Sequence, residues 1–507
     1  MTTQLPAALL HELLDETAAR RPDRPAVTCH DHTLTYRELA AASRRVAYWL
    51  GELGLRRGHR LLVGAQASTT VPVLVYAASR LGVAFSLLHE QVQGEQLEHV
   101  LDDSEPMLLV SDSAPNRATA AGRGVRAEDL ATVTARAFDT EGKDGPVPTA
   151  PLAVDPVCLI YTSGTTSLPK AVVSTHQQML FAVRAIQHVL GYRPDDVVYS
   201  PLPLSFDYGL YQLFLGACGG AHVWLGRAAE VGPPLLTNLL RSRATVLPAV
   251  PSVADTLARL LRRTGDRKPA LRMLTNTGAA MPQDTLAVLR ANLPGLDVHL
   301  MFGLTECKRA TIMPANGDLA RPGSSGPALP GTEVFVVDAN GQRLPAGEIG
   351  EIVVRGPNVM SGYWRHAELS AQRYPRAEGL FPELRTGDFG RLDEEGYLYV
   401  EGRRDDVYKE NGFRVSVIEV EAAARRLPAV GSAAVLAPDG SAPARLFVTV
   451  TDESSGADVL QAMRQVIEEY KIPRTCLVVP ELPLTGNGKT DRKALAALAN
   501  RVDHVRG

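Results

Sequence analysis

Residues 157–170 read VCLIYTSGTTSLPK, an apolar run followed by a loop of serine, threonine and glycine that ends in a single lysine. The apolar run predicts a buried strand. Small residues let backbone N–H groups approach a polyphosphate, hydroxyl groups can donate to it, and a lysine neutralises its charge. The spacing is not that of a Walker A loop. An ordinary turn has the same local composition, so only the surrounding sequence can distinguish a phosphate-binding loop from a turn.

Strand-like apolar runs and helical segments alternate on both sides of this loop, from about residue 60 to about residue 323. This alternation is typical of βαβ units and a parallel sheet. Before it, residues 7–20 and 36–55 are expected to form amphipathic helices, the second with Thr35 as its N-cap. Residues 113–151 have no clear period, and we expect a surface excursion there.

After about residue 323 the pattern changes to short strands separated by glycine and proline, which predicts a small β-rich subdomain. From about residue 405, strands and helices alternate again over a length that suits an independent α+β domain. The predicted fold is therefore α/β. A large N-terminal domain, residues 1–404, contains parallel α/β subdomains plus the β-rich subdomain, and a small α+β C-terminal domain follows over residues 405–507.

Charge and composition exclude several classes of protein. The 507 residues carry 53 Lys and Arg against 56 Asp and Glu, a net charge of −3, so we expect neither nucleic acid nor an anionic membrane surface as a partner. The five cysteines are scattered and never form CxxC, which favours a reducing compartment and no metal cage. No run approaches 18 apolar residues, and we expect a cytoplasmic protein. Only eight of the basic residues are lysine.

Three further motifs carry candidate chemistry. In MFGLTE, residues 301–306, Phe302 could stack on a base while Glu306 holds a divalent ion. In RTGD, residues 385–388, Asp388 can accept both hydroxyls of a ribose, and an arginine of the following GRRDD can bridge sugar and phosphate. Near the C-terminus, PLTGNGKTDRK presents Lys489 on a glycine-rich loop. Taken alone, the first two motifs also fit purely structural roles. The first could be a core phenylalanine with a capping glutamate, and the second could be a turn with a solvated charge cluster.

Six motifs in register resemble the adenylate-forming superfamily of acyl-CoA synthetases, nonribosomal peptide adenylation domains and luciferases. They are YTSGTTSLPK, SFDYG, FGLTE, GEIGEIVVRGPNVMSGYW, RTGDFGRLDEEGYLYVEGRRDD and PLTGNGKTDRKAL, and the resemblance runs from residue 34 to residue 495. It implies that a carboxylic acid attacks ATP to give acyl-AMP and pyrophosphate. The acyl group then passes to the thiol of CoA or of a carrier-protein pantetheine. ATP and Mg²⁺ are the implied cofactors, and CoA or phosphopantetheine is the implied acceptor.

The resemblance also implies a role for each motif residue. Thr305 would contact the α-phosphate, Glu306 would bind Mg²⁺, and Lys489 would bridge the carboxylate and the α-phosphate. Asp405 matches the hinge on which the small, mobile C-terminal domain rotates after adenylation. Lys409 and Gly412 would line the thiol channel. The implied nucleotide-binding residues are Ser163, Gly164, Thr165, Thr166, Lys170, Gly278, Ala279, Phe302, Asp388 and Arg403.

The phosphate loop departs from the family pattern at two positions, where Ser167 and Ala171 replace glycine. If either position requires a positive φ, the replacement costs about 1 kcal/mol or more and stiffens the loop. Both candidate lysines remain, which favours an active enzyme over an inactive homologue.

The sequence is compatible with two classes of acid substrate. The implied acyl pocket consists of Asp207, Tyr208, Tyr211, Thr275, Thr277, Met301, Arg309 and Ala310. Asp207 falls where amino-acid-activating members pair an aspartate with the α-ammonium group, which favours an amino or β-amino acid. However, SFDYG also resembles stand-alone acyl-CoA ligases, and Arg309 can occupy Asp207 in an internal ion pair. Two tyrosines and a methionine suit an aryl or aliphatic acid, and we favour this second reading.

The sequence also leaves more than one possible acceptor for the acyl group. No phosphopantetheine attachment site follows the last motif, so we expect a free-standing enzyme that meets CoA, slightly favoured, or a separate carrier protein. Two further hypotheses remain. The activated acid could meet a non-thiol nucleophile, in an amide-forming or diazo-forming branch. The protein could also be a nonenzymatic nucleotide-binding protein, which Lys489 and Glu306 disfavour.

Overall fold

The structure is a computed structural model. It describes residues 7–139, 145, 150–162, 169–263, 265, 267–377, 380–403, 407–410, 413–438, 443–467, 469–485 and 489–506.

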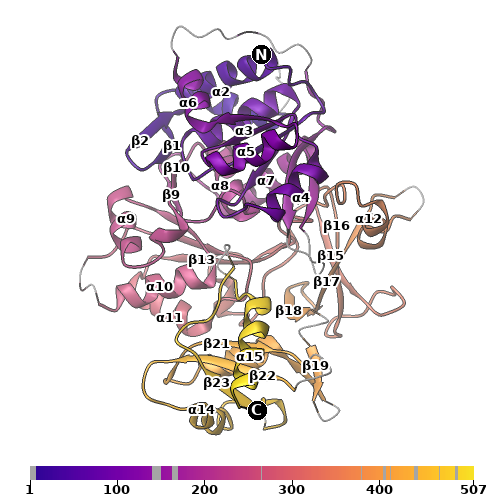
Figure 1. Ribbon diagram of the computed structural model, residues 1–507. Coiled ribbons are helices and arrows are strands. Elements are labelled where there is room, and N and C mark those ends of the chain that lie inside the picture. The colour runs from indigo at the N-terminus through magenta and orange to yellow at the C-terminus, as the bar shows by residue number, and fades with distance from the viewer. Residues whose placement is uncertain are drawn as a thin grey trace.

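Two large sheets form the N-terminal part of the molecule (Figure 1). In the first sheet, β8 runs antiparallel to β7 and the other strands are parallel. In spatial order this sheet consists of β6 (Arg126–Asp129), β5 (Leu108–Ser111), β3 (Arg60–Gly64), β4 (Ala84–Leu88), β7 (Pro156–Thr162) and β8 (Lys170–Thr175).

The second sheet has eight strands, of which six are parallel and the two at the edges are antiparallel. In spatial order it consists of β14 (Thr311–Ile312), β13 (Asp297–Phe302), β12 (Met273–Asn276), β11 (Val246–Ala249), β9 (Val197–Ser200), β10 (His222–Leu225), β1 (Pro25–Cys29) and β2 (His32–Thr35). The parallel sheets predicted from the alternating pattern are confirmed.

Helices connect these strands, as the βαβ pattern requires. They are α1 (Leu10–Arg20), α2 (Tyr36–Glu52), α3 (Thr70–Leu81), α4 (Glu95–Ser104), α5 (Ala114–Gly122), α6 (Leu130–Phe138), α7 (His176–Leu190), α8 (Asp207–Gly219), α9 (Pro234–Ser242), α10 (Pro251–Leu261) and α11 (Gln283–Asn292). The N-cap prediction for α2 is confirmed: Thr35 accepts a hydrogen bond from the Glu38 amide, and the Glu38 carboxylate accepts one from the Thr35 amide.

One expectation was wrong. Residues 113–151 are not merely a surface excursion, because they contain α5, β6 and α6. The sequence does not predict the strand β6, because three of its four residues, RAED, are charged and the strand lies at the edge of the sheet, beside β5.

A β-rich region follows the second sheet. It is an antiparallel sheet of β15 (Glu333–Val337), β16 (Gly350–Arg355), β17 (Glu383–Leu392) and β18 (Leu398–Arg403), accompanied by α12 (Ala367–Arg373). The C-terminal region comes last and lies at the bottom of Figure 1. It contains β19 (Val407–Glu410), β20 (Phe413–Ser416), α13 (Val417–Arg425), β21 (Val430–Leu436), β22 (Arg445–Val450), α14 (Gly456–Met463), β23 (Thr475–Val478) and α15 (Arg492–Arg506).

The C-terminal region has an apolar core of its own, which includes Val415, Val420, Leu446 and Met463. The β-rich region likewise has a separate core around Val354 and Met360. The α/β class with a large N-terminal part and a small C-terminal part is therefore confirmed. The boundary at residues 404 and 405 stays a prediction.

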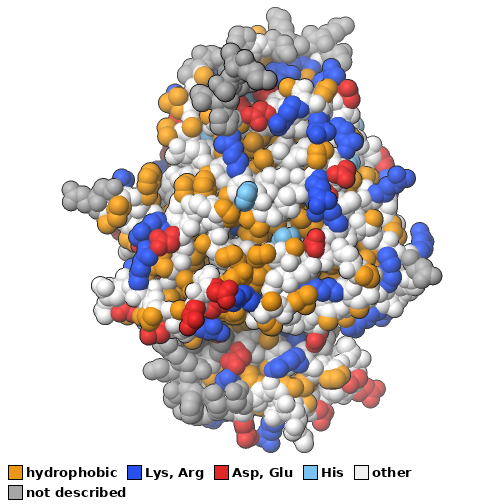
Figure 2. All heavy atoms as spheres, turned by 180° about the vertical axis from the view of Figure 1, so that it is seen from behind, with side chains coloured by type: hydrophobic (Ala, Val, Ile, Leu, Met, Phe, Trp, Pro, Cys, Tyr) orange, Lys and Arg blue, Asp and Glu red, His pale blue; other side chains and the backbone are white. Residues whose placement is uncertain are grey.

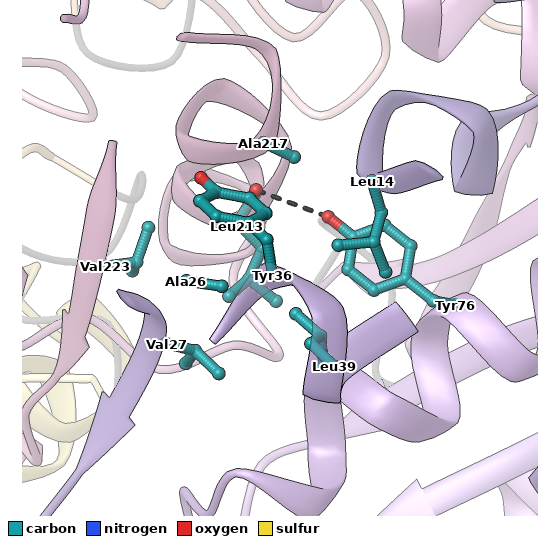
Figure 3. Close-up of a pocket in the computed structure, with 9 residues that line it drawn as sticks. All are labelled: Leu14, Ala26, Val27, Tyr36, Leu39, Tyr76, Leu213, Ala217 and Val223. Carbon is teal, nitrogen blue, oxygen red and sulfur yellow. Dashed lines mark hydrogen bonds between the residues drawn. The ribbon is translucent and has the colours of Figure 1, made fainter. Parts of the chain in front are cut away.

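A small cavity lies inside the largest core, where α1, α2 and α8 meet (Figure 3). Its volume is about 10 Å³, and apolar side chains line most of it. The two tyrosine hydroxyls there donate to backbone carbonyls: Tyr76 to Leu213, and Tyr36 to Gly216 and Ala221. A space of this size holds at most one water molecule. It is a packing defect, and the candidate site lies elsewhere.

The surface carries both signs of charge. On the face seen in Figure 2, Lys and Arg side chains are interspersed with Asp and Glu. Among the helices that the structure describes, none is both long and apolar enough to cross a membrane.

Candidate active site

The candidate site forms where neighbouring parallel strands of the second sheet end. Strands β9, β11, β12 and β13 are parallel, and candidate site residues lie at the ends of β12 and β13. Thr277 and Gly278 follow β12, and Phe302 is the last residue of β13. Ligands of open α/β sheets bind at this carboxyl edge. The hydrophobic pattern of the strands therefore brings together motifs that are far apart in the sequence.

Lys489 reaches this edge from the C-terminal region. Gly278 has a φ of +92°, and a Cβ atom there would lie 3.2 Å from Cε of Lys489. The Lys489 ammonium also lies 5.9 Å from the centre of the Phe206 ring, just before α8. The structure thus brings the predicted catalytic lysine to the predicted nucleotide-binding segment.

Glu306, Tyr363 and Lys170 form a second group at the site. The Tyr363 hydroxyl donates to Oε1 of Glu306 at 2.7 Å, and the Lys170 ammonium lies 4.2 Å from the centre of the Tyr363 ring. Burial and the nearby Glu306 carboxylate raise the pKa of Tyr363, which keeps its hydroxyl protonated as a donor. Lys170 begins β8, directly after the serine- and threonine-rich loop.

The residues around Glu306 fit the Mg²⁺ that the resemblance implies. Mg²⁺ is commonly bound by one or two carboxylates together with the phosphates of a substrate. Within the described residues, no group of three His, Cys, Asp or Glu side chains could hold a metal ion alone. A single partly exposed carboxylate such as Glu306 therefore suits an ion that arrives with a nucleotide.

Asp388 and Arg403 are brought together by strand pairing. Asp388 is buried in β17, and its backbone lies opposite Arg403 in the antiparallel register with β18. The Asp388 amide donates to the Thr386 hydroxyl, which holds the RTGD turn. The sequence prediction that these two residues act at one place is consistent with this register.

The candidate acyl pocket contains a buried cluster of charges. Asp207 begins α8, and its Oδ2 lies 3.4 Å from Nη1 of Arg309, both side chains being buried. This is the internal ion pair that the sequence suggested. The same Arg309 nitrogen donates to the backbone carbonyl of Lys308 at 2.6 Å, so the guanidinium is shared between two acceptors.

Lys308 is the least expected residue of this cluster. Its side chain is 0 % exposed, and its ammonium has no hydrogen-bond partner in the part of the chain that the structure describes. It lies 5.9 Å from the centre of the Tyr211 ring. Burial lowers the pKa of Lys308, and the negative charge of Asp207 partly opposes this shift. Tyr211 and Thr277 also have hydroxyls without a partner among the described residues.

The remaining predicted pocket residues are engaged in hydrogen bonds or buried in hydrophobic cores. Tyr208 donates to the backbone carbonyl of Thr275, and the two hydroxyls also lie within hydrogen-bond distance. Met301 is buried in the core of the second sheet, and Ala310 in the core of the β-rich region. Their roles in substrate binding stay predictions.

Several predicted residues lie outside the described residues: Ser163, Gly164, Thr165, Thr166, Ser167, Asp405 and Gly412. For Arg403 and Lys409 the backbone is described, in β18 and β19. Ala171 lies inside β8, paired with Tyr161, and is not among the described residues with positive φ. The concern about strain at that position is therefore removed.

Sequence reasoning missed two residues of the site, Lys308 and Tyr363. Lys308 directly follows the FGLTEC segment in a chain with few lysines, which was a usable signal. Tyr363 belongs to the GYW at the end of a quoted motif, but its contact with Glu306 spans 57 residues and is visible only in three dimensions.

Comparison with known proteins identifies the class. The AMP-binding enzyme family matches residues 14–364, and the AMP-binding enzyme C-terminal domain matches residues 419–489. The chain therefore belongs to the AMP-binding enzyme family. It is an AMP-forming acid–thiol ligase, which activates a carboxylic acid with ATP and transfers the acyl group to a thiol.

Three relatives show how far the similarity extends. An L-proline–[L-prolyl-carrier protein] ligase of Pseudomonas fluorescens is 31% identical, over 96% of this chain and 99% of that protein. The structure of VinN with L-aspartate is 37% identical, with a TM-score of 0.71 over 78% of this chain and 98% of that one. The o-succinylbenzoate coenzyme A synthetase MenE of Bacillus subtilis, with AMP, is 28% identical, with a TM-score of 0.83 over 95% of this chain and 97% of that one.

Proposed function

We propose that this ligase activates an amino dicarboxylic acid and loads it onto the pantetheine thiol of a separate carrier protein. The observation that carries the substrate class is the buried ammonium of Lys308 beside Arg309. A buried donor without a partner costs about 1–3 kcal/mol, and more when it is charged. An anionic group of the substrate would supply the missing acceptor and recover that free energy.

The charges of the pocket define what this group is. Lys308 and Arg309 provide two basic groups, and Asp207 provides an acidic one. Burial lowers the pKa of Lys308, and an anionic group of the substrate would oppose that shift. The acid's reacting carboxylate is needed at Lys489, so the group that binds Lys308 and Arg309 is a second carboxylate. Asp207 is then available to an ammonium group, since its contact with Arg309 is long at 3.4 Å.

A solved relative supports this assignment. VinN was crystallised with L-aspartate, an acid that carries both an amino group and a second carboxylate. Of the two classes of acid substrate compatible with the sequence, we therefore favour an amino or β-amino acid. The aryl or aliphatic reading is set aside because it leaves Lys308 buried without an acceptor.

In the adenylation step, Phe302 would contact the adenine, and Asp388 with Arg403 would hold the ribose. Lys170 and the loop before it would bind the phosphates, and Thr305 the α-phosphate. Glu306 would hold Mg²⁺, which supplies charge neutralisation on the phosphates when bound. Lys489 would neutralise charge that develops between carboxylate and α-phosphate, a contribution on the order of 3–4 kcal/mol. Rotation about Asp405 would then open the site to the thiol.

A carrier protein is proposed as the acceptor in place of CoA. The supporting observation is that a prolyl-carrier protein ligase matches this chain over nearly the full length of both. A CoA ligase such as MenE has a similar fold, so CoA is the alternative acceptor.

Acid-dependent ATP–pyrophosphate exchange with a matched set of acids tests the substrate class. The set is L-aspartate, its two monoamides L-asparagine and L-isoasparagine, and succinate. We expect exchange with L-aspartate, a loss of 10-fold or more with each monoamide, and a smaller loss with succinate. Exchange with either monoamide that equals exchange with L-aspartate would refute the dicarboxylate proposal.

A further inference from the structure

Tyr363 joins the two groups that handle the phosphates, although neither motif analysis nor the proposed function assigns it a role. Its hydroxyl donates to Oε1 of Glu306 at 2.7 Å, and its ring lies beneath the Lys170 ammonium at 4.2 Å. One side chain therefore contacts the candidate metal ligand and the candidate phosphate lysine at once.

The backbone holds Tyr363 firmly at this place. Its residue forms a bridge with Val172 of β8, so it moves with the strand that Lys170 begins. Its amide donates to the Ser370 hydroxyl at 2.9 Å, and the Met360 amide donates to the Glu306 carbonyl at 2.9 Å. The Tyr374 ring packs edge-on against it at 5.7 Å. The side chain is thus fixed from both of the segments that it connects.

The arrangement has a chemical consequence for Glu306. One carboxylate oxygen accepts a hydrogen bond from the Tyr363 hydroxyl, which leaves the other oxygen for a cation. The Tyr363 side chain therefore contacts one acidic and one basic group of the site. Without the hydroxyl, the Glu306 carboxylate would lose the hydrogen bond that fixes its orientation.

We propose that Tyr363 is a positioning residue, which fixes Glu306 for Mg²⁺ through its hydroxyl and orients the Lys170 ammonium through its ring. The proposal rests on the proposed roles of Glu306 and Lys170. It adds a residue that prepares the nucleotide site before any acid binds.

The test measures ATP binding by calorimetry as a function of Mg²⁺ concentration, with the full-length protein and no acid present. Tyr363→Phe keeps the ring beneath Lys170 and removes only the hydroxyl. We expect the half-saturating Mg²⁺ concentration to rise about 10-fold, as for loss of a hydrogen bond to a charged group. Tyr363→Leu, which also removes the ring, should in addition weaken binding of ATP without Mg²⁺.

Tyr374→Phe is the matched control. Its hydroxyl is buried and has no partner among the described residues, so its removal should leave the Mg²⁺ dependence unchanged. Melting temperatures of all variants check that each is folded.

A double-mutant cycle separates this inference from the proposed function. If Tyr363 acts through Glu306, then Tyr363→Phe has no further effect on Mg²⁺ dependence in a Glu306→Gln background. If Glu306→Gln alone leaves the Mg²⁺ dependence unchanged, the proposed metal role of Glu306 is wrong, and this inference falls with it. If Glu306→Gln changes it and Tyr363→Phe does not, only the role of Tyr363 is overturned.

Discussion

Lys308 is the residue on which the proposed substrate selection depends. Its side chain is fully buried, and its neighbour Arg309 forms an ion pair with Asp207. A protein gains no stability from a buried donor without a partner, so such a group is retained where a ligand completes it. The Arg309 guanidinium is also shared, since the nitrogen near Asp207 donates to the Lys308 carbonyl.

Lys308→Met should weaken binding of the acid substrate without lowering the stability of the folded protein. We expect the KM for L-aspartate to rise by about 10- to 100-fold, because a hydrogen bond to a charged group is worth about 1.5–3 kcal/mol. The KM for ATP should change little. The melting temperature without ligand should not fall, since methionine buries a similar volume without an unpaired charge.

Lys268→Met is the control for that substitution. Lys268 donates to the Leu261 carbonyl and to Oδ1 of Asn292, and neither partner is among the predicted pocket residues. An equal rise in the KM for L-aspartate in both variants would contradict the role given to Lys308.

At the scale of elements, the N-terminal helix α1 depends on a histidine in another helix. The Leu10 amide, at the start of α1, donates to Nδ1 of His176 at 3.1 Å, where α7 begins. Burial lowers the pKa of His176 from 6.5 to about 4, with Asp155 opposing the shift, and His11 is a nearby titratable group. Only neutral His176 can accept this hydrogen bond, so protonation would release the start of α1.

The sign of the pH effect follows from this lowered pKa. Below pH 6.5 the unfolded chain binds a proton at His176 that the folded chain does not, so stability falls as the pH falls toward 4. The loss is up to about 1.4 kcal/mol for each pH unit. We expect hydrogen exchange of α1 to accelerate between pH 7 and pH 5 after correction for intrinsic rates. His176→Gln should reduce that acceleration, and an identical acceleration in both proteins would count against the mechanism.

The sequence predicts secondary-structure elements that depend on a local pattern of residues. It does not predict elements and side-chain contacts that depend on packing against distant segments. The strands before the motifs and the capping box of α2 follow from hydrophobic runs and from Thr35 and Glu38. Strand β6 was missed because its polar residues are strand-forming only beside β5. The burial of Lys308 and the contact between Tyr363 and Glu306 were missed because both need segments that are distant in the sequence.

At the scale of the whole molecule, the C-terminal region inserts Lys489 into a site built by the N-terminal part. The contact with Gly278 is close, and any side chain at that position would compete with the lysine. This arrangement suits adenylation. The rotation proposed for the thiol step, with Asp405 as its hinge, would withdraw Lys489.

Gly278→Ala should therefore hinder adenylation. Gly347→Ala is the matched control, because Gly347 has a φ of +86° but no atom within 4 Å of its Cβ position. Both variants carry similar backbone strain, about 1 kcal/mol. We expect only Gly278→Ala to slow pyrophosphate exchange, on the order of 10-fold or more, since it displaces Lys489. Equal slowing in both variants would show that strain alone is responsible.

The most direct test of the central claim is acid-dependent ATP–pyrophosphate exchange by Lys489→Ala, with ATP binding measured in parallel. We predict that exchange falls by about 100-fold or more, as expected for loss of a preorganised charge at the transition state, while ATP binding is largely retained. Unchanged exchange would contradict the claim that Lys489, inserted beside Gly278, carries out the adenylation step.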